Sequence, residues 1–224
     1  MFDSMLKYNL GEGAEAFSTE RDASYPYQVI LGNQIHGCKV AVIDRTDYDE
    51  APDGCDALVT DLPGVAVGVR TADCVPILLY DSTKKVVAAV HAGWRGTVLN
   101  VARKAVNVME SRFGCRAVDM TAVMGPAIGP ASFQVGEEVA MRFKEAGFPM
   151  QDIWKFCGHG DGSPMSGGHH IDLIKANRWL LEQAGVPAES IRDAGIDTYT
   201  NKAFFSARRE GTDCGRIITA IKLV

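Results

Sequence analysis

Three side chains that bind soft or borderline metal ions stand where apolar runs of the sequence stop. His36 follows the run 27–31, Cys74 follows 65–70 and His91 follows 86–90. Because neighbouring strands tend to end at the same edge of a sheet, we expect these three side chains to converge. Two imidazoles and one thiolate suit Zn²⁺, and three protein ligands leave the fourth tetrahedral position open for water or substrate, as in a catalytic site.

Spacing alone leaves a second interpretation open, in which the three residues are unrelated parts of the core or of loops. The sequence has no Cys-x-x-Cys pair and no His-Glu-x-x-His motif. The other histidines, His159, His169 and His170, lie in or beside the glycine-rich segment 158–168. We interpret them as solvated loop residues that could reach over the site as a lid.

The segment after His91 has the composition of an anion site. Gly93 and Gly96 bracket Arg95, and a helical pattern begins near residue 97. Glycines let backbone N–H groups approach a ligand, and the start of a helix favours an anion. The alternative interpretation is an ordinary strand–turn–helix connection.

Other polar and aromatic residues could complete such a site. Asp73, beside Cys74, is a candidate general acid or base, or a carboxylate satisfied by turn backbone. Arg208 is a candidate for binding phosphate or carboxylate, although neighbours such as Arg208 and Arg209 point to opposite faces of an extended strand. The aromatic side chains that could stack on a planar ring, or pack in the core, are Tyr199, Phe204 and Phe205.

Composition limits the class of protein. The 224-residue chain has 46% hydrophobic and 23% charged residues and a net charge of −5. These values are typical of a globular protein, and the acidic balance argues against a dedicated nucleic-acid-binding protein. There is no apolar run of the roughly 18 residues that a membrane span needs, and no signal-peptide pattern. We therefore expect a cytoplasmic protein whose six cysteines are reduced thiols.

Hydrophobic periodicity predicts strands in the first part of the chain and helices later. Helices are expected at 98–113, 135–146 and 171–184. We infer a mixed α/β (α+β) fold, in which residues 1–224 form a single domain with a mixed β core flanked by helices. The expected strands are 6–10, 27–31, 40–43, 57–60, 65–70, 76–80, 86–90, 118–124, 191–196 and 217–223.

Five motifs occur in a fixed order: NQIHG (33–37), TADCVPILL (71–79), VHAGWRGT (90–97), GPAIGPASFQVGEEV (125–139) and FFSARREGTDCGR (204–216). From residue 33 onward the chain resembles the YfiH/YlmD-type family, once called multicopper polyphenol oxidases or laccases and related to mammalian FAMIN. The resemblance implies that His36, Cys74 and His91 form a metal site, assigned as zinc. It also implies phosphorolysis of purine nucleosides, with methylthioadenosine as a further substrate and adenosine deamination as an accessory activity. The implied partners are a small nucleoside and phosphate, with no nucleic acid and no membrane.

The chain departs from the family pattern in two places. Residues before 33 carry no Arg-His-Gly-Gly-like stretch, and Asp197-Thr198 stands where the family often has Cys-Thr. Neither departure involves the three candidate ligands.

Three other functions stay open. A cysteine hydrolase would use Cys74 as nucleophile and His91 as base. A copper-dependent polyphenol oxidase is disfavoured, because five histidines are too few for a multicopper cluster. A purely structural zinc would make the fold depend on the metal.

Overall fold

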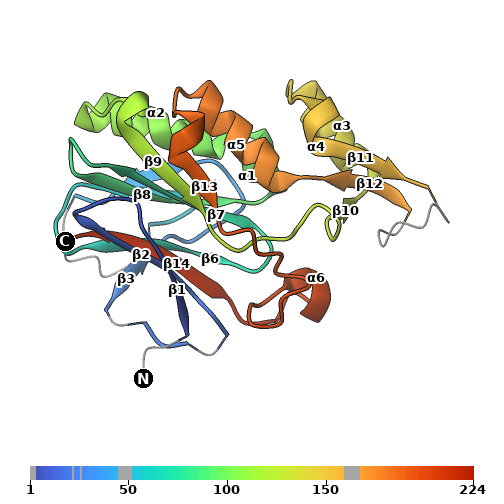
Figure 1. Ribbon diagram of the computed structural model, residues 1–224, viewed down its shortest axis with the longest axis horizontal. Helices are drawn as coiled ribbons and strands as arrows, with labels where there is room; N and C mark the ends of the chain where they lie inside the picture. Colours follow the sequence, from blue (N-terminus) through green and yellow to red (C-terminus); the bar gives the residue numbers. More distant parts are fainter. Residues whose placement is uncertain (1–3, 22, 26, 45–51, 159–166) are drawn as a thin grey trace.

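The computed structural model describes residues 4–21, 23–25, 27–44, 52–158 and 167–224. Figure 1 shows helices packed over a six-stranded sheet, with a five-stranded sheet on the other side. A three-stranded sheet with two further helices extends from one end. The expected mixed α/β fold, with a β core flanked by helices, is confirmed.

The six-stranded sheet, in the order β13-β9-β7-β8-β5-β4, is the centre of the fold. Its strands β7 and β8 are buried at every position, because alternate side chains face the helices and the second sheet. Such strands read as continuous apolar runs, as the sequence does here. The bounds are β4 Val40–Val42, β5 Ala57–Thr60, β7 Val75–Asp81, β8 Val86–Ala92, β9 Met120–Met124 and β13 Ile191–Asp193.

The five-stranded sheet has the order β1-β2-β14-β6-β3. Its central strand β14 pairs antiparallel with both β2 and β6, and Ile217 lies opposite Thr71. This register places the start of β14 beside the end of β6. The bounds are β1 Met5–Tyr8, β2 Ala14–Thr19, β3 Val29–Leu31, β6 Ala66–Thr71 and β14 Ile217–Leu223.

The helices differ from the expected ones mainly at their ends. The predicted helix 98–113 corresponds to α2, which begins at residue 101, because Asn100 with φ 63° separates it from a short preceding helix, α1. The helix predicted from residue 135 begins later, because 134–135 pairs as β10 with β12. The helix bounds are α1 Trp94–Val98, α2 Val101–Phe113, α3 Glu137–Glu145, α4 Met150–Ile153, α5 Leu173–Gln183 and α6 Ala207–Glu210, and the small sheet comprises β10 Gln134–Val135, β11 Trp154–Cys157 and β12 Gly168–Ile171. None of the helices within the described ranges combines the length and apolar character needed to cross a membrane.

Candidate functional site

The structure brings the three predicted metal ligands together. One potential ligand atom from each of His36, Cys74 and His91 lies within 4.8 Å of the other two. The two imidazole rings meet edge to face, with centroids 4.8 Å apart and an interplanar angle of 79°. His36 is exposed and His91 is buried, so the cluster lies at the wall of the fold and is open on one side.

Each ligand comes from a different element. His91 is in β8 and shares its strand face with Val87 and Ala89, which pack between the two large sheets. Cys74 lies in the bend that leads from β6 of one sheet to β7 of the other, and His36 lies in the loop after β3.

Positive φ angles occur at this site. His36 has φ 60°, and Asp73, directly before Cys74, has φ 91°. Residues other than glycine seldom adopt this conformation, and such residues concentrate at functional sites. The backbone is therefore held in an uncommon conformation on the segments that carry two of the three ligands.

Asp56 fixes both histidines, and sequence reasoning did not identify it. Its Oδ1 lies 2.7 Å from His91 Nδ1, and its Oδ2 accepts the backbone N–H groups of Gly37 (2.7 Å) and Ile35 (3.3 Å) on either side of His36. Because Nδ1 of His91 is engaged, Nε2 is the ring nitrogen left to bind a metal. A carboxylate paired with the other ring nitrogen is the usual support of a metal-binding histidine.

The charges within the cluster are coupled. Burial alone would lower the pKa of His91, but the hydrogen bonds that its ring donates to Asp56 and Cys74 outweigh this effect and raise that pKa to about 9. Burial alone would raise the pKa of Cys74, but hydrogen bonds with His36 and His91 lower it to about 6. Cys74 is thus readily a thiolate, which is the form that binds a metal.

Gly93 and Gly96 pack against this cluster. A Cβ on Gly93 would lie 3.0 Å from the Sγ of Cys74 and 3.1 Å from Cδ2 of His36. A Cβ on Gly96 would lie 2.8 Å from the carbonyl oxygen of Gly37. The two glycines therefore let α1 approach the ligand loops closely.

A cavity of about 330 Å³ opens beside the three ligands. Its volume is at the lower end of the range for small-molecule sites, roughly 300–1,000 Å³. Its lining includes Arg70, Thr71 and Arg216, which sequence reasoning missed because the register of β6 with β14 brings them together. The described lining residues are Asn33, Gln34, His36, Arg70, Thr71, Ala72, Cys74, His91, Ala207, Thr212 and Arg216.

Five predicted site residues lie outside this lining, and two of them are Gly93 and Gly96. Asp73 accepts hydrogen bonds from the Thr198 hydroxyl (2.6 Å) and the Arg208 backbone N–H (2.7 Å), so both carboxylate oxygens are engaged. Arg95 is exposed, with its guanidinium 4.5 Å from the ring centre of Trp94. The guanidinium of Arg208 donates to the carbonyls of residues 132 and 134.

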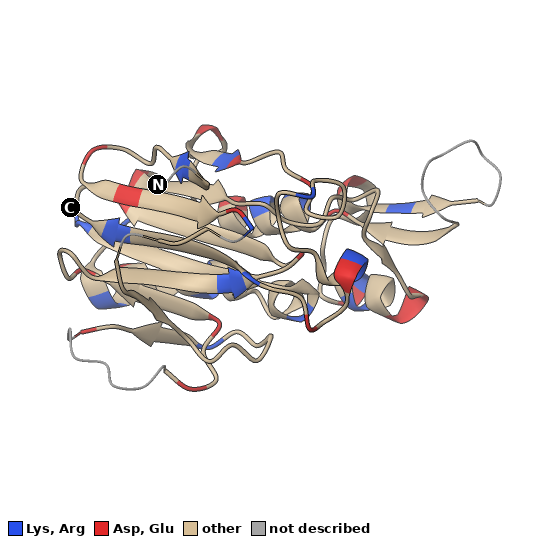
Figure 2. Ribbon diagram, turned by 90° about the horizontal axis from the view of Figure 1, so that it is seen from below, with Lys and Arg blue, Asp and Glu red and all other residues tan. Residues whose placement is uncertain are grey.

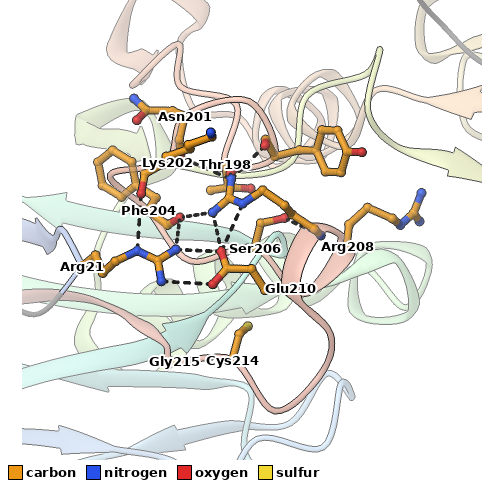
Figure 3. Close-up of polar contacts among 12 residues, drawn as sticks. Arg21, Thr198, Asn201, Lys202, Phe204, Ser206, Arg208, Glu210, Cys214 and Gly215 are labelled. Atoms are coloured by element: carbon orange, nitrogen blue, oxygen red, sulfur yellow. Dashed lines mark hydrogen bonds and ion pairs between the residues drawn. The ribbon is translucent and has the colours of Figure 1, made fainter.

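A polar network holds the wall of the cavity that follows α6 (Figure 3). Arg209 donates to the carbonyl oxygens of Thr198 and Phe204, and it also pairs with Glu210. Glu210 is bound in turn by both terminal nitrogens of Arg21, at 3.0 and 2.7 Å. Arg209 is therefore a structural residue, and α6 is tied to the segment after β2.

The remaining candidates are placed elsewhere. His169 lies against Trp154 and Phe156 in the small sheet, and buried His170 has Nδ1 3.1 Å from the Pro130 carbonyl. His159 lies outside the described residues. The aromatic candidates 199, 204 and 205 are absent from the described cavity lining.

Comparison with known proteins assigns the family. Residues 14–224 match the family described as multi-copper polyphenol oxidoreductase laccase. The chain belongs to this family.

Its relatives carry enzyme names. The chain is 45% identical, over 86% of its length and 74% of the relative's, to "Adenosine deaminase RL5" from an unknown prokaryotic organism. It is 44% identical to "Purine nucleoside phosphorylase" of Bacteroides thetaiotaomicron, over 76% of this chain, and it spans 61% of that protein. The crystal structure of Bacillus licheniformis YfiH superimposes with a TM-score of 0.87 at 25% identity, covering 100% of this chain and 98% of that one. The resemblance to the YfiH/YlmD-type family is thereby confirmed.

Proposed function

We propose that this chain is a zinc-dependent purine nucleoside phosphorylase with accessory adenosine deaminase activity, acting in the cytoplasm. Its substrates would be inosine, adenosine and methylthioadenosine. The observation that carries the proposal is the convergence of His36, Cys74 and His91 beside a cavity of ligand size. The names of the relatives supply the reaction classes. We also propose that residues 1–224 form one domain, since the Bacillus licheniformis structure covers the whole chain.

The donor set fits a zinc ion. A thiolate at Cys74 and neutral imidazole nitrogens at His36 and His91 are suitable ligands, and three protein ligands leave one position open. Zn²⁺ bound there would act as a Lewis acid and lower the pKa of water. Two histidines and a cysteine also occur at copper sites, so metal analysis is part of the test.

In phosphorolysis, a phosphate oxygen forms a bond to the anomeric carbon while the glycosidic C–N bond breaks. The electron pair of that bond goes to the purine nitrogen, and the proton of hydrogen phosphate ends on the purine. The products are ribose 1-phosphate and the free base. The protein's task is to hold the two reactants in line and to exclude bulk water.

Asp73, Arg95, Gly93, Gly96 and Arg208 have different parts in this proposal. Asp73 positions the turn that carries Cys74, and its proposed role as proton donor in deamination requires it to release a present partner. Gly93 and Gly96 keep α1 close to the ligands. Arg95 and Arg208 reach phosphate only if their side chains leave their present contacts.

Metal content and turnover test the proposal together. Purified protein is analysed by mass spectrometry for metal, and inosine with phosphate is assayed before and after chelation. About one zinc per chain, with turnover lost and circular dichroism unchanged on chelation, is expected. Copper in place of zinc, or full turnover without metal, contradicts the proposal, and unfolding on chelation supports a structural metal.

One observation favours a second function. His91 is oriented by Asp56 and lowers the pKa of Cys74, which is the arrangement of a cysteine nucleophile with its base and orienting carboxylate. A cysteine hydrolase predicts that alkylation of Cys74 abolishes activity in fully metal-free protein. The zinc enzyme predicts that the metal protects Cys74 from alkylation.

A further inference from the structure

The Thr71 side chain has an unusual environment. It ends β6 with 1% of its surface exposed, and its Oγ1 is the sole buried side-chain oxygen or nitrogen without a hydrogen-bond partner in the described part of the chain. Buried polar groups nearly always have a partner, so an exception calls for one from outside the chain. Thr71 also lines the cavity beside the metal ligands, where a reactant would supply that partner.

The topology places the Thr71 side chain on the face of β6 that looks toward β8. Thr71 shares its strand face with Val67 and Val69, which pack in the space between the two large sheets. His91 faces the same space from β8, against which β6 packs. Thr71 and His91 thus approach the cavity from opposite sheets.

Two arginines give this cavity its charge. Arg216 directly precedes Ile217, the residue opposite Thr71, and carbonyl oxygens of residues 212 and 215 hold its guanidinium. Arg70 has its backbone N–H and C=O bound by the Gln34 amide, while its guanidinium has no partner among the described residues. No carboxylate occurs among the described lining residues, so an anion is favoured there.

We propose that Thr71, Arg70 and Arg216 form the subsite for the phosphate co-substrate. This inference rests on the proposed phosphorylase function, because it assigns one of that reaction's two substrates to named residues. The Thr71 hydroxyl donates to one phosphate oxygen from between the sheets. The two guanidinium groups, at the rim, neutralise the charge of the others, since guanidinium suits phosphate geometry.

Thr71→Val is the test, because it removes the hydroxyl and keeps the shape. A hydrogen bond to a charged group corresponds to about 10- to 100-fold in binding, so KM for phosphate should rise by that factor. KM for inosine, zinc content and the thermal midpoint should not change, since the lost group has no partner within the protein. Thr71→Ser should restore KM, and Thr121→Val on β9 is the matched control. Arg216→Gln should also raise KM for phosphate, with Arg103→Gln on α2 as its control.

An assay of adenosine deamination distinguishes loss of the phosphate subsite from a general loss of activity. Deamination consumes water instead of phosphate, so Thr71→Val should deaminate adenosine at the wild-type rate. Equal loss of both activities, or an unchanged KM for phosphate, would overturn the proposal.

Direct binding of inorganic phosphate, measured by calorimetry on the zinc-loaded protein, separates the subsite from the proposed function. Binding by the wild type that is lost in Thr71→Val, without any phosphorolysis, would keep the subsite and refute the phosphorylase function. Binding of equal strength in both proteins would refute the subsite.

Discussion

Replacing Asp56 by asparagine tests the metal centre with minimal change in shape. The carboxylate accepts from His91 Nδ1 on one oxygen and from the N–H groups flanking His36 on the other. Asparagine has a single oxygen. If its NH₂ group faces His91, the imidazole must accept at Nδ1 and carry its proton on Nε2, the nitrogen needed for the metal. If the NH₂ group faces Gly37, two donors meet, and the loop that carries His36 loses the hydrogen bonds from its backbone N–H groups to residue 56.

Either orientation weakens metal binding. Loss of such a supporting carboxylate typically reduces metal affinity 10- to 100-fold, or about 1.4–2.7 kcal/mol. The pH alters the observed size of the effect. In the wild type, protons compete for His91 up to its raised pKa of about 9, and Asp56 contributes to that rise. Asp56→Asn removes part of this competition, so the loss of affinity should be larger at pH 9.5 than at pH 7.

The assay is competition for Zn²⁺ with a chromophoric chelator at both pH values. Asp61→Asn, an exposed carboxylate beyond β5, is the control and should bind zinc as the wild type does. A zinc dissociation constant within twofold of the wild type at pH 9.5 would refute the supporting role of Asp56.

Four further outcomes follow from the structure. In chelated protein, thiolate absorbance at 240 nm should grow as the pH rises through about 6, well below the ordinary range of a thiol, and Cys74→Ser should remove that transition. Gly93→Ala forces a Cβ against two ligands, and zinc content after dialysis should fall. Asp73→Ala leaves the buried Thr198 hydroxyl unpaired, and urea unfolding should show a loss of about 1–3 kcal/mol. Glu210→Gln loosens the wall after α6, and steady-state assays should show a higher KM for nucleoside with unchanged zinc content.

The strands were predicted best where burial is continuous. The expected strands 57–60 and 217–223 coincide with β5 and β14, since unbroken apolar runs suit strands covered on both faces. β2 was missed, because its sequence AEAFST mixes small, polar and charged residues. Its inner positions are buried through pairs such as Ser18 with Thr219, a hydrogen bond across 201 residues of sequence. A pattern read along the chain does not contain such a partner.

The residues of the candidate site also fall into those that a local sequence pattern predicts and those that only tertiary pairing brings together. His36, Cys74 and His91 were predicted because each ends an apolar run, which is a local signal. Thr71 and Arg216 are adjacent through the β6–β14 register, which arises only when the C-terminal strand joins the sheet. Arg95 and Arg208 attracted attention by charge, yet Arg95 lies over the neighbouring Trp94 ring, Arg208 is bound by the carbonyl of residue 134, and neither lines the cavity.

The origin of the ligands has a mechanical consequence. His91 belongs to the six-stranded sheet, His36 follows a strand of the five-stranded sheet, and Cys74 lies on the connection between them. An ion bound by all three ligands would link the two sheets at the end of the fold that carries the ligands, as a disulfide bond would. The cavity lies at this end, with Thr71 on one sheet and His91 on the other. The distance between the two sheets at the cavity, and hence the fit of any reactant, would then depend on the same ion that takes part in the chemistry.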